Sequence, residues 1–274
     1  MLIEVLILIK FLLLILVGIL AGILSGLFGL GGGVVVIPIL YVILKNSGSV
    51  APAVIMHVAI GTSLAIMLLT TANSIFQHHR AKNILWPLTR KLSPYVFLGV
   101  VLGSIISHFL HSNSLRFLFI LMLIGLILQG LFKKKEAQIC SIETFKFPDH
   151  WFSRFYFLLA GFFSVLLGIG GSLFCVSYVR HYGCPMKQAS ALAISLTPIV
   201  SLIGAIGYLF MGLHVHTGLP YSMGYIDWLA FFGVGLGTFF GVPVGVFFSK
   251  KLPDQYQAKI YILLLFVFLG LMLI

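Results

Sequence analysis

Two glycine clusters are the part of this sequence best suited to holding a small ion. They occupy Gly29–Gly33 (GLGGG) and Gly168–Ser172 (GIGGS), each within a long apolar stretch. Glycine at this density disfavours a helix interior and permits positive φ, so each cluster predicts a break in its stretch. A helix that starts after a break directs its unpaired N–H groups and the positive end of its dipole toward that break, which suits an anion. The candidate backbone ligands are Gly31, Gly32, Gly33, Gly170, Gly171 and Ser172.

Three hydroxyl side chains in other apolar stretches could complete the ligand shell around such an anion. Thr62 and Ser63 lie in one stretch, and Ser195 lies in another. Each hydroxyl has an alternative partner in the carbonyl group one turn earlier in its own helix. The glycines have an alternative role as well, because small residues let membrane helices pack closely.

His57 lies about one turn before Thr62 and is the candidate for proton coupling. An ionisable side chain inside a membrane stretch suggests a functional role, and imidazole titrates near neutral pH. A packed, neutral histidine is the alternative. Asp227 stands next to Trp228 at the start of an apolar stretch, and we expect it to be an interfacial anchor rather than a coupling group.

The sequence carries no recognisable catalytic or metal-binding signature. The pairs His78-His79 and His214-x-His216 have no nearby cysteine or carboxylate to complete a metal shell. The motifs G-x-S-x-G, H-E-x-x-H and the P-loop do not occur. We therefore expect no metal, no cofactor and no enzymatic activity, and transport that relies on an ion gradient or on passive flow.

The elements that position these residues are predicted to be membrane helices. Of the 274 residues, 60% are hydrophobic and only 8% are charged, and the mean hydropathy is +1.15, whereas soluble domains have about 25% charged residues. About 20 apolar residues span the hydrocarbon core as a helix. Eight apolar stretches occur, at 2–44, 50–76, 93–111, 114–132, 153–181, 187–212, 225–249 and 255–274. The predicted fold is an all-α, polytopic transmembrane helix bundle with about eight membrane segments.

The chain contains one internal repeat. GILSGLFGLGGG from Gly22 aligns with GFFSVLLGIGGS from Gly161, and AIGTSL from Ala59 aligns with ALAISL from Ala191. A third block aligns Trp86, Gly99, Gly103 and Ser107 with Trp228, Gly241, Gly245 and Ser249. Because the three blocks occur in the same order in both halves, we predict two homologous membrane repeats, 1–132 and 153–274, joined by a loop at 133–152.

Lysine and arginine residues predict how the two repeats are oriented. They gather in the gap 77–92, in the central loop and near residue 250, whereas 213–224 contains none. Basic gaps stay in the cytoplasm, and eight simple crossings would place 213–224 inside and the basic gap near 250 outside. The conflict disappears if 153–181 returns to the side on which it starts. The halves are then inverted repeats whose first segments are broken by glycine.

The formal net charge of +11 comes largely from the gaps between apolar stretches. The expected partner is therefore the lipid bilayer with its anionic headgroups, and nucleic acid is not expected. A homo-oligomer is compatible with the sequence. These observations predict a multi-pass membrane protein that acts as a secondary transporter of a small anionic substrate. An anion channel and an intramembrane enzyme acting on a lipid or acyl substrate are the alternatives.

Several of these blocks resemble a known family. GILSGLFGLGGGVVVIPIL, HVAIGTSLA and HHRAKNILW are similar to successive motifs of the sulfite exporter TauE/SafE family, and GIGGS with KQASALAISL resembles their second-half copies. The departures are Ser172 in place of a third glycine, Ser177 opposite Pro38, and Ala81 and Leu85 in place of a glycine and an acidic residue. The resemblance covers almost the whole chain and implies export or uptake of sulfur oxyanions or organosulfonates across a bacterial inner membrane.

Cysteine labelling in whole cells tests the predicted orientation. A Ser222→Cys variant should react with a membrane-impermeant maleimide in intact cells, because 213–224 is predicted to face outside. Cysteines placed in 133–150 or 250–254 should react only after the membrane is permeabilised. Labelling of Ser222→Cys only after permeabilisation would contradict the inverted-repeat model.

Overall fold

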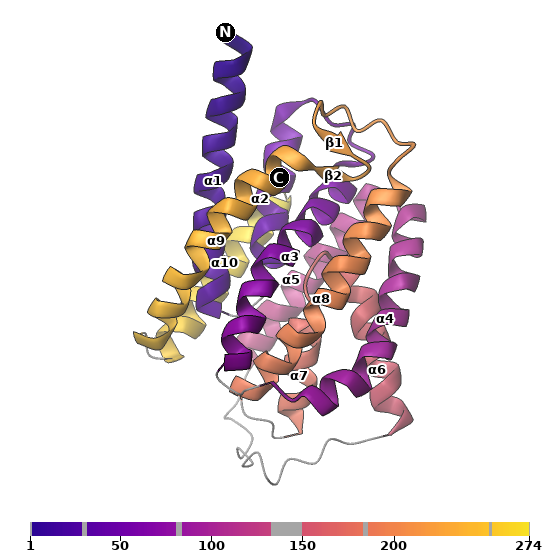
Figure 1. Cartoon of the computed structure of the whole chain (residues 1–274), viewed down its shortest axis with the longest axis vertical. Coiled ribbons are helices and arrows are strands. Elements are labelled where there is room, and N and C mark those ends of the chain that lie inside the picture. The colour runs from indigo at the N-terminus through magenta and orange to yellow at the C-terminus, as the bar shows by residue number, and fades with distance from the viewer. Residues whose placement is uncertain are drawn as a thin grey trace.

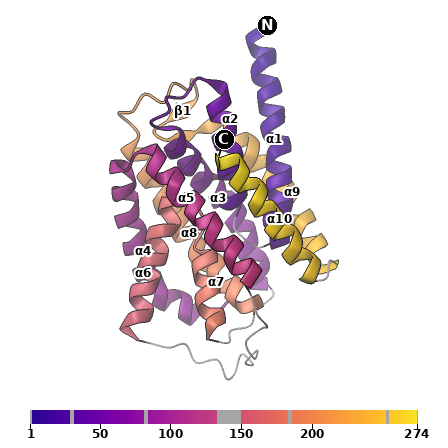
Figure 2. The ribbon, with the colours of Figure 1, turned by 180° about the vertical axis from the view of Figure 1, so that it is seen from behind.

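The structure is a computed structural model of the chain, and it describes residues 2–28, 32–80, 84–132, 150–182, 186–251 and 254–273. These residues form a bundle of ten α-helices with a short β-hairpin at one end (Figure 1, Figure 2). The helices are α1 (Leu2–Phe28), α2 (Gly33–Ser47), α3 (Ile55–Arg80), α4 (Trp86–Phe109), α5 (Ser112–Phe132), α6 (Trp151–Leu166), α7 (Ser172–His181), α8 (Met186–Met211), α9 (Trp228–Lys251) and α10 (Asp254–Leu273). Strands β1 (Ser222–Met223) and β2 (Ile226–Asp227) pair in antiparallel fashion.

The ten described helices correspond to the eight apolar stretches of the sequence. The first stretch divides into α1 and α2, the fifth divides into α6 and α7, and both divisions fall at a glycine cluster. Six helices in the described part are long and apolar enough to cross a membrane, and α2, α6 and α10 contain shorter apolar segments. The predicted all-α, polytopic helix bundle is therefore confirmed, while the number of full crossings stays a prediction.

Helices α3 and α8 form the centre of the bundle. Within their apolar spans 83% and 67% of the residues are buried, compared with 28% in the spans of α1 and α5. Helices α3 and α8 pack against each other, α2 and α9 pack against α3, and α4 and α7 pack against α8. A helix surrounded by other helices must be apolar or small on every face. Helix α3 meets this requirement with residues such as Ile60, Gly61 and Leu64.

Glycine brings two other pairs of helices into close contact. Gly18 of α1 and Gly237 of α9 lie so near the facing backbone that a side chain on either would overlap it. Further glycines continue this contact at four-residue spacing, namely Gly22, Gly26, Gly241 and Gly245. Helices α4 and α6 meet in the same way, since a Cβ on Gly161 would lie 2.5 Å from the carbonyl oxygen of Val96. At these two glycine seams, α1–α9 and α4–α6, close packing through small residues is the observed role.

The two seams connect the predicted halves crosswise. Helix α1, the first helix of the first half, packs against α9, the fourth helix of the second half. Helix α6, the first helix of the second half, packs against α4, the fourth helix of the first half. Figure 1 shows α1 beginning at the top of the view and α6 at the bottom, with the hairpin also near the top. Two repeats related by a two-fold axis would have these contacts, and the inverted topology in a membrane stays a prediction.

The α1–α9 seam should be sensitive to side-chain size. We expect Gly237→Leu to destabilise the protein by about 1–3 kcal/mol or more, because overpacking a close contact forces the backbones apart. Gly125→Leu is the matched control, since a Cβ on this α5 glycine would have no neighbouring group within 4 Å in the described part of the chain. Thermal unfolding in detergent measures both variants. Equal melting temperatures would show that the seam does not hold the helices.

Candidate functional site

The two helix breaks, one from each half, are in direct contact. A side chain on Gly33, the first residue of α2, would overlap the carbonyl oxygen of Gly168, and its Cβ would lie 3.1 Å from Cα of Ile169. Ser63 of α3 donates its hydroxyl to the same carbonyl oxygen of Gly168 over 3.3 Å. The structure therefore brings the glycine clusters together beside the most buried helix of the bundle.

The backbone at the breaks has the conformation that the glycines allow. Gly32 precedes α2 with φ of +83°, and Gly168 follows the end of α6 with φ of +60°, both in the left-handed region. The carbonyl oxygen of Gly32 accepts hydrogen bonds from the N–H groups of Val35 and Val36, at 3.0 and 2.9 Å. The N–H groups of Gly33 and Val34 come before these bonds, and a helix offers no acceptor of its own to its first N–H groups. The N-terminus of α2 therefore meets the break of the other half with its positive end.

The second cluster ends in the same way. The carbonyl oxygen of Gly171 accepts a hydrogen bond from the N–H group of Cys175 over 3.0 Å, so Gly171 immediately precedes the first turn of α7. A Cβ on Gly170 would lie 2.6 Å from Cγ2 of Thr197 and 3.0 Å from Sδ of Met67. Close packing therefore explains the glycine at 170. Gly31 and the side chain of Ser172 lie outside the described part of the structure.

The three predicted hydroxyl ligands have different partners. Ser63 bonds the Gly168 carbonyl at the break, as described above. Ser195 donates to the carbonyl oxygen of Leu192 over 2.7 Å and lies 2.7 Å from the hydroxyl oxygen of Thr89. The hydroxyl oxygen of Thr62 accepts a hydrogen bond from the N–H group of Asp227 over 3.0 Å, which connects α3 to the hairpin. Among the described residues, Ser63 is the one of these three hydroxyls whose bond lies at a glycine cluster.

His57 lies nearer the hairpin than the breaks. Its Nε2 donates to the carbonyl oxygen of Ser107 over 3.0 Å, and its ring stacks on that of Tyr225 with centroids 5.0 Å apart. The side chain is 3% exposed, and its Nδ1 has no hydrogen-bond partner among the described residues. His57 precedes Ser63 by six residues, which is about 9 Å along the helix axis. It is buried, and its described partners are Ser107 and Tyr225 rather than residues of the glycine clusters.

Asp227 caps the N-terminus of α9. Its Oδ1 accepts hydrogen bonds from the N–H groups of Leu229 and Ala230, at 3.0 and 3.2 Å. Burial raises the pKa of the Asp227 carboxyl, and the two N–H donors act in the opposite direction. The anchoring role expected from the sequence fits this geometry, because the carboxyl group fixes the start of a membrane helix.

Two serines that were not among the predicted site residues lie at the breaks. A Cβ on Gly32 would lie 3.7 Å from Oγ of Ser25, and a Cβ on Gly171 would lie 4.0 Å from Oγ of Ser164. Both serines are buried. They are matched positions of the internal repeat, so the alignment of the halves could have identified them.

The described residues supply these breaks with dipoles and hydroxyls rather than charged side chains. The buried polar residues of the described part are hydroxyl residues together with His57, Gln188 and Asp227, and no lysine or arginine is among them. An anion at the breaks would therefore be bound by N–H and O–H donors.

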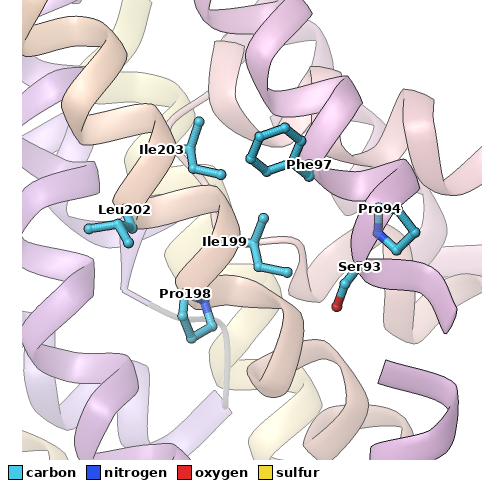
Figure 3. A pocket seen from close by; sticks show the side chains of 7 residues that line it. All are labelled: Ser93, Pro94, Phe97, Pro198, Ile199, Leu202 and Ile203. Atoms are coloured by element: carbon cyan, nitrogen blue, oxygen red, sulfur yellow. The ribbon is translucent and has the colours of Figure 1, made fainter. Parts of the chain in front are cut away.

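A separate cavity of about 450 Å³ lies between α4 and α8 (Figure 3). It is lined by Ser93, Pro94, Phe97, Pro198, Ile199, Leu202 and Ile203. Ser93 provides the only polar side chain in this lining, and its hydroxyl donates to the carbonyl oxygen of Thr89 over 2.7 Å. Phe97 and Leu202 are about half exposed, so the cavity opens on the outside of the bundle. This lining suits an apolar chain and does not suit a small anion.

Comparison with known proteins supports the membrane assignment. The family described as Sulfite exporter TauE/SafE matches residues 14–273. The chain belongs to this family. A probable membrane transporter protein of Haemophilus influenzae is 31% identical over 241 residues, which cover 88% of this chain and 89% of the relative. A probable membrane transporter protein of Methanocaldococcus jannaschii is 31% identical over 205 residues, covering 73% of this chain and 72% of the relative.

This TauE/SafE-family protein is accordingly a multi-pass membrane transporter. A third relative, from Bacillus subtilis, is 27% identical over 232 residues and is also named a probable membrane transporter protein. No solved structure matches the chain. The family and the names of its members point to transport rather than to enzymatic catalysis.

Proposed function

We propose that this TauE/SafE-family protein is a secondary transporter of small anions, namely sulfur oxyanions or organosulfonates, in the inner (plasma) membrane. The observation that carries the proposal is the contact between the two helix breaks, at Gly33 and Gly168. Each break is followed by a helix whose first N–H groups have no partner in that helix. Two such N-termini in one region favour an anion without any buried lysine or arginine.

The arrangement of the halves supports alternating access as the transport mechanism. One break comes from each of the predicted repeats, 1–132 and 153–274. Their glycines lie beside the central helices, Gly33 next to Met67 of α3 and Gly170 next to Thr197 of α8. In an inverted repeat the substrate site lies at the interface of the repeats, and the two sides open in turn as one repeat moves against the other. The seams α1–α9 and α4–α6 are the contacts between the repeats that such a movement would involve.

Flux measurements separate the proposed function from its alternatives. Proteoliposomes loaded with unlabelled sulfite or an organosulfonate should accumulate the radiolabelled anion from outside by exchange, with saturation. An anion channel would show flux without exchange or saturation. An intramembrane enzyme would show neither anion exchange nor saturation and would instead consume a lipid or acyl substrate. Consumption of such a substrate without anion exchange would overturn the proposal.

The glycine at each break should be required for flux. We expect Gly32→Leu and Gly171→Leu to insert in the membrane but to lose anion binding and transport. At Gly32 the positive φ disfavours any side chain, and at Gly171 the new side chain would occupy the approach to the first turn of α7. Gly125→Leu, in α5, is the control and should transport as wild type does. Normal sulfite flux in both break variants would show that the clusters serve packing alone.

His57 is the proposed proton-coupling group. If it carries the coupled proton, His57→Ala should abolish the stimulation of sulfite flux by a pH gradient while exchange at equal pH is partly retained. His108→Ala is the control, because His108 lies exposed in the last turn of α4. Flux measured in the two variants at several gradients checks this. An unchanged pH dependence in His57→Ala would leave His57 with a packing role beside Tyr225.

A further inference from the structure

We propose that Ser164 and its repeat counterpart Ser25 are substrate ligands, and that each donates its hydroxyl to an oxygen of a small oxyanion bound at the adjacent break. This inference rests on the proposed anion transport and extends it by naming side-chain ligands. It concerns residues outside the set Thr62, Ser63 and Ser195 that the sequence alone suggested.

Ser164 has an unusual environment for a helical serine. The residue is fully buried at 0% exposure, and its Oγ has no hydrogen-bond partner among the described residues. Other buried hydroxyls in this bundle donate to a carbonyl group one turn earlier, as Ser104 does to Val100 over 2.8 Å and Thr197 does to Ala193 over 2.9 Å. A buried hydroxyl without a partner costs free energy. A ligand at the break would supply that partner.

The hydroxyl of Ser164 is close to the N-terminus of α7. The point where a Cβ of Gly171 would lie is 4.0 Å from Oγ of Ser164, and α7 begins at the next residue. A ligand atom near this point can accept both from the hydroxyl and from the N–H groups of the first turn of the ten-residue helix. The N–H groups at the start of α7 and the hydroxyl of Ser164, which belongs to the preceding helix α6, are therefore independent hydrogen-bond donors to a ligand beside Gly171.

Packing does not account for glycine at position 171. A Cβ there would meet nothing closer than Cγ2 of Val200 at 3.8 Å, which is ordinary van der Waals contact with a described residue. By contrast, a Cβ on the neighbouring Gly170 would lie 2.6 Å from Thr197. The absence of a side chain at 171 keeps the approach to the α7 N–H groups open.

The other break repeats this arrangement. Ser25 of α1 is 7% exposed, and its Oγ lies 3.7 Å from the point where a Cβ of Gly32 would be. Ser25 precedes Gly32 by the same seven residues that separate Ser164 from Gly171. Each half therefore places a serine hydroxyl and a helix N-terminus beside a glycine, which gives two equivalent groups of hydrogen-bond donors.

The chemistry of these donors indicates the class of ligand. N–H and O–H groups from two directions match an anion that offers more than one acceptor oxygen, such as sulfite or the sulfonate head of an organosulfonate. Neutral donors hold such an anion less tightly than a buried lysine or arginine would, which suits a transporter that must let its substrate go.

The test compares Ser164→Ala and Ser25→Ala with Ser104→Ala, a buried helical serine whose hydroxyl is already bonded. In proteoliposomes we expect each break variant to raise the KM for sulfite exchange about ten-fold or more, as for a lost hydrogen bond to a charged group. Ser104→Ala should change the KM less than about two-fold, since its hydroxyl makes only a local helix bond. Binding of sulfite to the purified variants, followed by the shift in melting temperature, should weaken in parallel.

The melting temperature without sulfite separates a ligand from a structural residue. Ser164→Ala should melt at or above the wild-type temperature, because it removes a buried hydroxyl that has no described partner. A wild-type KM in Ser164→Ala, with saturable exchange in the unmodified protein, would overturn this inference and leave the proposed function intact. A lower melting temperature with an unchanged KM would likewise assign Ser164 to packing. Lack of saturable exchange in the unmodified protein would remove the proposed function and this inference together.

Discussion

A backbone N–H or C=O group that faces lipid has no hydrogen-bond partner there, and this constraint decides where a membrane chain can be interrupted. The described edges of both interruptions lie against buried helices, Gly33 beside Met67 of α3 and Gly170 beside Met67 and Thr197 of α8. Ser63, from the opposite half, donates a hydrogen bond to the carbonyl oxygen of Gly168 at one interruption. The surrounding helices then serve to keep the two interruptions enclosed in protein, and the donors that remain at the helix starts are directed inward.

Glycine has two distinct roles in the same chain. In the seams, at positions such as Gly18 and Gly237, it allows one backbone to lie against another, and any side chain would overlap. At Gly32 it permits a left-handed backbone. At Gly171 it leaves open space where a side chain would stand, since the nearest described atom is 3.8 Å from the Cβ position. The seams require closeness and the breaks require space. Composition alone cannot distinguish these roles, because both appear in the sequence as glycine in an apolar stretch.

Much of the fold could be predicted because apolar stretches and an internal repeat are local or periodic properties of the sequence. The repeat also predicted that the two clusters would be related, and Gly33 does contact Gly168. The bond of Ser195 to Leu192 is the within-helix partner that the sequence allowed. Its contact with Thr89 and the bond of Thr62 to Asp227 could not be predicted, since these residues are distant in sequence and only the packed bundle brings them near. Ser164 was missed for a different reason. The repeat alignment marks its position, but any helical serine can bond its own helix, and the structure is needed to show that this one has no partner among the described residues.

The crosswise seams also determine the order in which this protein can be completed during synthesis. Helix α1 ends at Phe28 and its seam partner α9 begins at Trp228, so 199 residues of chain lie between the two helices. At ribosomal rates of about 5–20 residues per second, α1 waits roughly 10 to 40 seconds before α9 exists. During that interval the glycine face of α1 must be covered by lipid or by the insertion machinery. Neither half can therefore finish assembling before the other has largely been made.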